Sequence, residues 1–93
     1  MNKLSLFLLS ILVINFSGCV TISKEYFDPS WTRESVQGAW KKNPDRVYRN
    51  SSKLKYGADE ICEWEYPGGG TVDRYYFKNG KVIEVESIVY ENL

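Results

Sequence analysis

The chain begins with a short apolar segment that is followed at once by small residues. Lys3 precedes a run from residue 4 to residue 14 in which only Ser5 and Ser10 are polar. A helix that spans a bilayer needs about 20 apolar residues, whereas an apolar run of about 7–15 residues before small side chains is typical of a secretory signal. The sequence therefore predicts export of the chain and no membrane-spanning segment here.

The small residues end in a cysteine. Residues 16–19, Phe-Ser-Gly-Cys, resemble the lipobox of bacterial lipoprotein signal peptides, although Phe16 stands where that pattern usually has an aliphatic side chain. The resemblance implies that residues 1–18 are removed and that the thiol of Cys19 carries a diacylglycerol. Val20 occupies the place where an aspartate favours the inner membrane, so the resemblance implies anchoring on the periplasmic side of the outer membrane. The alternative is an ordinary signal peptide with a chance cysteine.

The composition of the mature chain excludes several kinds of site. Removing 18 of the 93 residues leaves about 75, which is enough for one small domain with a marginal core. Basic and acidic side chains nearly balance, with 12 of each in the full chain, so no global charge draws the protein to nucleic acid. The absence of histidine removes the usual zinc sites and histidine-dependent catalysis. We therefore expect no enzymatic activity, no cofactor, no metal and no nucleic-acid partner.

One further cysteine remains in the mature chain. If Cys19 is a thioether, Cys62 has no partner thiol in an oxidising compartment. We expect Cys62 to be a small core residue beside Trp64. The alternative is a mixed disulfide with a partner protein.

The first half of the mature chain predicts a tether and then a helix. Residues 19–31 have no sustained hydrophobic period and contain Pro29, so we interpret them as a lipidated tether. Residues 32–42 are predicted to be helical, with Thr32 as a good N-cap residue and Pro44 unable to continue the helix. An apolar stripe with i, i+3, i+4 spacing should face the core. Its members are Val36, Ala39 and Trp40.

Alternating apolar and charged side chains predict three strands, as in a sheet with one buried face. An Asn-Gly pair marks a hairpin between the last two. A two-residue turn would set Glu84 opposite Tyr75, among apolar side chains. We therefore prefer a three-residue turn with Gly80 as a left-handed bulge, which pairs Tyr75 with Ile83, and on the opposite face pairs Arg74 with Glu84. The strands are expected at residues 60–66, 71–78 and 81–90.

Together these elements predict an α+β fold class, in which one main helix packs on a three-stranded antiparallel β-meander within a domain at residues 32–93. The motif positions of the helix and strands are Thr32, Val36, Trp40, Pro44, Trp64, Tyr66, Tyr75, Phe77, Gly80 and Val82. At these positions the chain resembles the BamE/SmpA-like family of small bacterial outer-membrane lipoproteins. Lys41 replaces the family's helix-ending glycine. The family's first helix would be reduced to a short one around residues 23–27.

No group of residues in the sequence suggests chemistry, so we expect contact surfaces. Arg74 and Tyr76 fall on the sheet face away from the predicted core, where a partner could reach them. Arg46, Arg49 and Lys53 lie in a basic loop, in which residues 46–49 are a candidate for a short extended piece. The loop is either simply solvated or a contact for anionic lipid or an acidic partner. We expect a non-catalytic protein-binding module of the cell envelope that supports outer-membrane assembly or integrity. The alternative is a small periplasmic inhibitor or protective factor that binds an enzyme or toxin.

Overall fold

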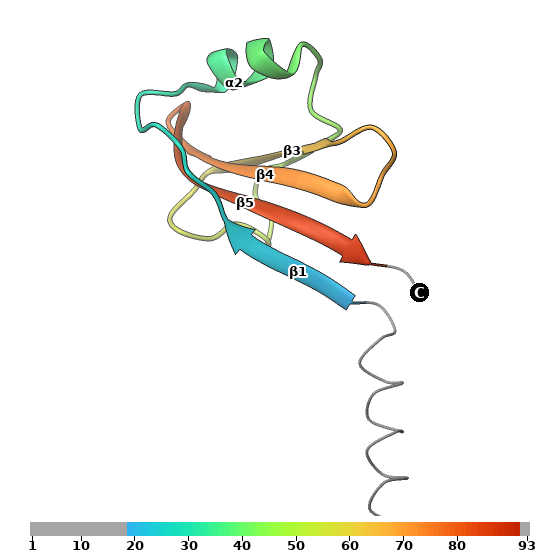
Figure 1. Cartoon of the computed structure of the whole chain (residues 1–93). Helices are drawn as coiled ribbons and strands as arrows, with labels where there is room; N and C mark the ends of the chain where they lie inside the picture. Colours follow the sequence, from blue (N-terminus) through green and yellow to red (C-terminus); the bar gives the residue numbers. More distant parts are fainter. Residues whose placement is uncertain (1–18, 92–93) are drawn as a thin grey trace, which may run out of the picture.

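The computed structural model describes residues 19–91, and in this range the chain forms five strands and one helix (Figure 1). The elements are β1 (Cys19–Lys24), α2 (Arg33–Trp40), β2 (Arg46–Tyr48), β3 (Glu60–Glu65), β4 (Thr71–Lys78) and β5 (Lys81–Glu91). The strands make one antiparallel sheet in the order β1-β5-β4-β3-β2. The predicted signal peptide, residues 1–18, lies outside the described residues.

The predicted fold class is wrong, because the structure is mostly sheet. The three predicted strands correspond to β3, β4 and β5, but the sheet continues past them on both sides. β1 pairs with β5 and comes from the segment interpreted as a tether. β2 pairs with β3 and comes from residues 46–49, interpreted as a short extended piece but not as part of the sheet. Residues 23–27, where the family resemblance implied a short helix, include the end of β1 and no helix.

The helix α2 is short because both of its ends are capped. Thr32 is the N-cap residue, as predicted: its side chain accepts a hydrogen bond from the Ser35 N–H at 3.1 Å, and Ser35 Oγ accepts one from the Thr32 N–H at 2.9 Å. Lys41 adopts the left-handed conformation, with φ 61°, and donates its N–H to the Gln37 carbonyl. The helix therefore ends at Trp40, earlier than predicted.

The hairpin between β4 and β5 contains a bulge, but this bulge lies at Ile83 and not at Gly80, where the sequence analysis placed it. Its turn has two residues, Asn-Gly, with φ values of 51° and 80°, and the pairing shifts farther along the strands, where Ile83 becomes the extra residue. The preferred register, with Tyr75 opposite Ile83 and Arg74 opposite Glu84, is therefore wrong. Because of the bulge, the hairpin can have a two-residue turn and still place the apolar Val85 opposite Tyr75. The pairs beyond it are Tyr76–Glu84, Tyr75–Val85 and Arg74–Glu86.

The main core lies between α2 and the sheet. Val36 of the helix is buried, and Trp40 stacks on the fully buried Trp64 with ring centroids 5.9 Å apart. The Trp64 indole N–H donates a hydrogen bond to the Lys42 carbonyl at 3.0 Å, which ties the chain after the helix to β3. Buried residues of this core are Val36, Cys62, Trp64, Phe77, Val82 and Val85, with Phe27, Trp31, Trp40 and Tyr75 packed against them.

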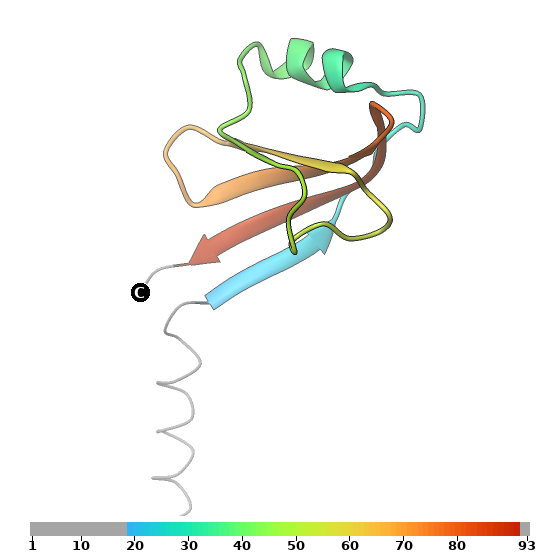
Figure 2. The same cartoon turned by 180° about the vertical axis from the view of Figure 1, so that it is seen from behind.

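The other face of the sheet is covered by residues 49–59, which we call the covering segment. Figure 2 shows the chain between α2 and β3 passing in front of the sheet toward β1. Tyr56 anchors this segment to the sheet. Its hydroxyl donates a hydrogen bond to the Glu86 carboxylate at 2.6 Å, and its ring packs edge-on against Tyr76 with ring centroids 4.9 Å apart. The buried residues on this face are Ile61, Glu63, Val72, Tyr76, Glu86 and Ile88.

Candidate functional site

The predicted anchor joins the folded domain without a linker. Cys19 is the first residue of β1, and its backbone pairs with Glu91 at the end of β5. From there β1 runs along the outer edge of the sheet (Figure 1). Lipidation of Cys19 stays a prediction, and a lipid on it would sit at the corner where β1 begins and β5 ends. No helix in the described part of the chain is long and apolar enough to cross a membrane.

Arg74 and Tyr76, predicted as partner contacts, do not lie on an open surface. Tyr76 has no exposed area, and 14% of the Arg74 side chain is exposed. The Tyr76 hydroxyl donates to Glu86 at 2.8 Å, and Arg74 Nε donates to Glu63 at 2.6 Å. The assumption that this sheet face is open was therefore wrong. A partner could reach either side chain only by displacing the covering segment.

The three basic residues predicted as contacts lie at the surface, each beside a partner within the chain. Each of these side chains remains partly exposed to solvent despite its interaction. Contact with a lipid or an acidic protein stays a prediction for all three. The pairs are Arg46 with Glu63 at 2.7 Å, Arg49 with Glu60 at 2.5 Å, and the Lys53 ammonium with the Tyr48 ring at 5.4 Å.

In several ion pairs on the covered face the acidic side chain is largely buried and the basic side chain is exposed. In three of them the acidic side chain is at most 17% exposed, whereas the basic side chain is at least 40% exposed. The exposed members of these three pairs are therefore basic, although Arg46 also pairs at 2.9 Å with Glu65, whose side chain is 44% exposed, and the whole chain is neutral. Such a surface attracts anionic groups in a salt-dependent way. The three pairs are Lys24–Glu84, Arg46–Glu63 and Lys55–Glu86.

Beneath the covering segment, two buried carboxylates share one guanidinium. Besides its bond to Glu63, Arg74 lies 3.9 Å from Glu86. Burial alone would raise the pKa of Glu86, but hydrogen bonds from Tyr56 and Tyr76, together with nearby positive charge, hold it below its ordinary value. Burial raises the pKa of Tyr76 to about 12, so its hydroxyl stays a donor at neutral pH. These protonation states suit a structural role.

Cys62 is a free thiol buried in the main core. Burial raises its pKa to about 11, so little thiolate forms near neutral pH. We therefore expect Cys62 in the folded protein to resist iodoacetamide at pH 8 and to react completely once the chain is unfolded in guanidinium, as measured by intact mass. Equal reaction rates before and after unfolding would contradict the buried position. A mixed disulfide would add mass that a reductant removes.

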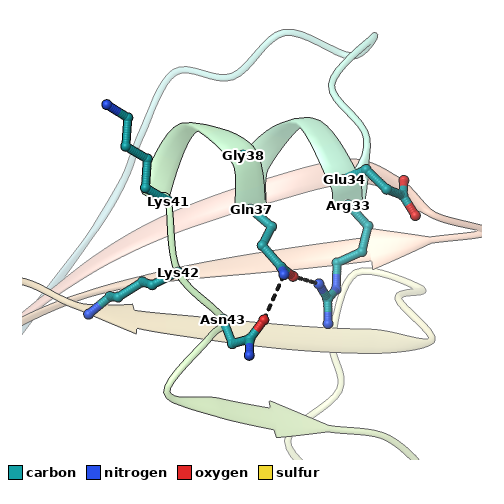
Figure 3. Close-up of a pocket in the computed structure, with 7 residues that line it drawn as sticks. All are labelled: Arg33, Glu34, Gln37, Gly38, Lys41, Lys42 and Asn43. Atoms are coloured by element: carbon teal, nitrogen blue, oxygen red, sulfur yellow. Dashed lines mark hydrogen bonds between the residues drawn. The ribbon is translucent and has the colours of Figure 1, made fainter.

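A polar hollow lies beside α2 (Figure 3). Its volume is about 620 Å³. The Gln37 amide bridges its two sides, accepting a hydrogen bond from Arg33 and donating one to Asn43 at 2.7 Å. Arg33, Gln37 and Asn43 are thus joined to one another, and none of the lining groups is a nucleophile beside a base. The lining residues are Arg33, Glu34, Gln37, Gly38, Lys41, Lys42 and Asn43.

The outer edge of β1 is the feature that the sequence analysis missed. Val20, Ile22 and Tyr90 are between 44% and 52% exposed, and Tyr90 pairs with Val20 across the ladder. Large apolar side chains therefore gather beside the predicted anchor. The sequence does contain a short strand pattern here, because β-branched Val20 and Ile22 alternate with Thr21 and Ser23.

The described residues offer surfaces for contact and no metal site. Within residues 19–91, no group of three or more His, Cys, Asp or Glu side chains could hold a metal ion. The anchor corner, the uncovered edge of β1 and the basic covered face are the features that could carry a function. In comparisons with protein-family models, with curated proteins and with solved structures, the chain matches none.

Proposed function

We propose that the protein is a lipid-anchored, non-catalytic binding module that holds another envelope protein at the periplasmic side of the outer membrane. The observation that carries the proposal is the place of Cys19, because the lipobox cysteine is also the first residue of β1. With no linker, a lipid on Cys19 would keep the sheet against the membrane surface. Its exposed surfaces would then meet ligands in or beside that membrane.

The charge arrangement supports a binding role. Bases that face outward over buried acids give a positive surface without a high net charge. A surface of this kind favours acidic partners, or the phosphates of anionic lipids, at low ionic strength. The resemblance to the BamE/SmpA-like lipoproteins suggests that the bound protein takes part in outer-membrane assembly or integrity.

The Cys19→Ser variant tests the anchor. Without the thiol no diacylglycerol can be attached, so we expect an uncleaved precursor or a soluble secreted form in place of the membrane-bound protein. Cell fractionation and incorporation of a labelled fatty acid measure this directly. Cys62→Ala, which removes the other cysteine, should keep both the label and the membrane location. If Cys19→Ser kept them too, the lipoprotein assignment would be excluded.

Crosslinking in intact cells tests the binding role. Purification of the crosslinked parent chain should enrich an envelope protein that the Cys19→Ser chain does not enrich, because only the anchored form is held near it. Enrichment of barrel-assembly components would support the assembly role. A single hydrolase or toxin would instead identify an inhibitor. Equal enrichment by both chains would contradict a function that depends on the membrane.

A further inference from the structure

The backbone ladder shows which groups on β1 are unpaired. The Glu25 N–H donates to the Val85 carbonyl at 2.9 Å, and on the other side of β5 the Tyr90 N–H donates to the Gly70 carbonyl at 2.7 Å. Residue pairs in an antiparallel ladder alternate between hydrogen-bonded and non-hydrogen-bonded. The first bond makes Glu25–Val85 a hydrogen-bonded pair, and the second shows that Tyr90, opposite Val20, points its N–H away from β1. Both therefore indicate that every second residue of β1, starting at Val20, points its N–H and C=O away from β5. These residues are Val20, Ile22 and Lys24.

No segment within residues 19–91 covers this edge. β1 is the last strand of the sheet, and its register with β5 is regular over its whole length. Natural sheets usually protect an edge with a proline, a bulge or inward-pointing charge. β1 has only Lys24, at its far end. The edge is therefore a template on which another strand can pair.

We propose that the strand that pairs there is β1 of a second copy, antiparallel to the first about a twofold axis through Ile22. Ile22 then lies opposite the partner's Ile22, and Val20 lies opposite the partner's Lys24. Every outward N–H and C=O meets an outward group of the other copy. A shift by one residue would set outward groups against inward ones, and a shift by two would leave one of the three residues without a strand partner.

The side chains of the edge fit this pairing. Val20 and Ile22 lie on the same sheet face and are half-exposed, so the pairing would join their side chains into one apolar strip across the axis. The two Lys24 side chains would lie four residues apart, about 14 Å. Like charges are therefore not opposed.

The predicted anchors also fit the twofold arrangement, and here the inference rests on the proposed lipid attachment. The two Cys19 residues would lie about 20 Å apart and at equal height along an axis normal to the sheet, so both lipids can enter one leaflet. A single pair of six-residue strands falls well short of the roughly 1,200 Å² that a stable interface buries. Confinement of both copies in the membrane would supply the effective concentration that such a small contact needs.

Crosslinking in native membranes provides the test. In Ile22→Cys, the two new thiols should be separated by a Cα distance of about 5.5 Å, which a short bismaleimide can bridge. The background should be low, because the proposed lipid would block Cys19 and because Cys62 is buried. We expect a covalent dimer from Ile22→Cys and none from the matched control Ser52→Cys, which lies in the exposed part of the covering segment.

Two separate proline substitutions, at neighbouring positions of β1, test the edge geometry independently. Ile22→Pro removes an N–H that points outward, so the ladder with β5 should survive while pairing between copies is lost. Thr21→Pro removes an N–H that bonds to Val89 and should lower the melting temperature. For the readout, donor and acceptor dyes on Ser52→Cys chains in vesicles should transfer energy, and adding Ile22→Pro should abolish the transfer.

The outcomes separate the inference from the function on which it rests. A membrane-bound Ile22→Cys chain that gives no dimer overturns the self-pairing and leaves the anchor standing. A crosslinked product of another mass means that a strand of a different protein occupies the edge, which also overturns it. If the chain is found in the soluble fraction, the anchor fails and the inference fails with it.

Discussion

Trp64→Ala is expected to lower the free energy of unfolding by about 3–5 kcal/mol. Trp64 has no exposed area, stacks on Trp40, and is the link between β3 and the chain after the helix through its bond to the Lys42 carbonyl. A domain of this size has a total stability of roughly 4–11 kcal/mol. The variant should therefore lose a large share of the total stability and melt at a clearly lower temperature than the parent, as measured by thermal denaturation followed by near-ultraviolet circular dichroism.

Tyr26→Ala is the matched control for loss of an aromatic ring. Tyr26 is 80% exposed and touches only the edge of Trp31 among the aromatic rings described. Its removal should change the stability by less than about 1 kcal/mol. Equal effects of the two substitutions would mean that α2 does not pack on the sheet through Trp64.

The strands that could be predicted are those with one apolar and one charged face. In β3, Cys62 and Trp64 alternate with Glu63 and Glu65, and this alternation alone is enough to place the strand. β1 shows an alternation over only four residues, Val20 to Ser23, and both of its sides are exposed, so the pattern was too short to separate an edge strand from a tether. Pro29 excluded a helix and did not exclude a strand that ends at Lys24.

The covered face could not be predicted, because its charges are neutralised only in the correct register. Glu63 and Arg74 look like solvated residues when each is considered on its own strand. The bulge at Ile83 brings Glu86, and not Glu84, opposite Arg74, so that both carboxylates meet the guanidinium. No local pattern in the sequence predicts a bulge at Ile83. Arg74 and Tyr76 were treated as open contacts for a different reason, because the covering segment was interpreted as a solvated loop and in fact packs on this face through Tyr56.

Arg74→Met is expected to lower the free energy of unfolding at pH 7 by about 3–5 kcal/mol, because it leaves two buried carboxylates without their shared guanidinium. Glu63 and Glu86 have side chains only 3% exposed. Urea denaturation measures the loss. The matched control Lys41→Met removes an equal charge at an exposed position and should change stability by less than about 0.5 kcal/mol. Adding Glu63→Gln and Glu86→Gln to Arg74→Met should restore much of the loss.

The pH dependence separates lost charge pairing from lost packing. In the parent the pKa of Glu86 is lowered from 4.5, so its stabilisation is complete above that value and is lost as the pH falls through the lowered pKa. In Arg74→Met the pKa of Glu86 should rise toward its value in the unfolded chain, because one of the positive charges that lower it is gone, whereas the hydrogen bonds from Tyr56 and Tyr76 and the charge of Lys55 remain. The variant should therefore lose less stability than the parent as the pH falls from 7 through the pKa of this group. Parallel changes in parent and variant over that range would show that Arg74 contributes through packing and not through its charge.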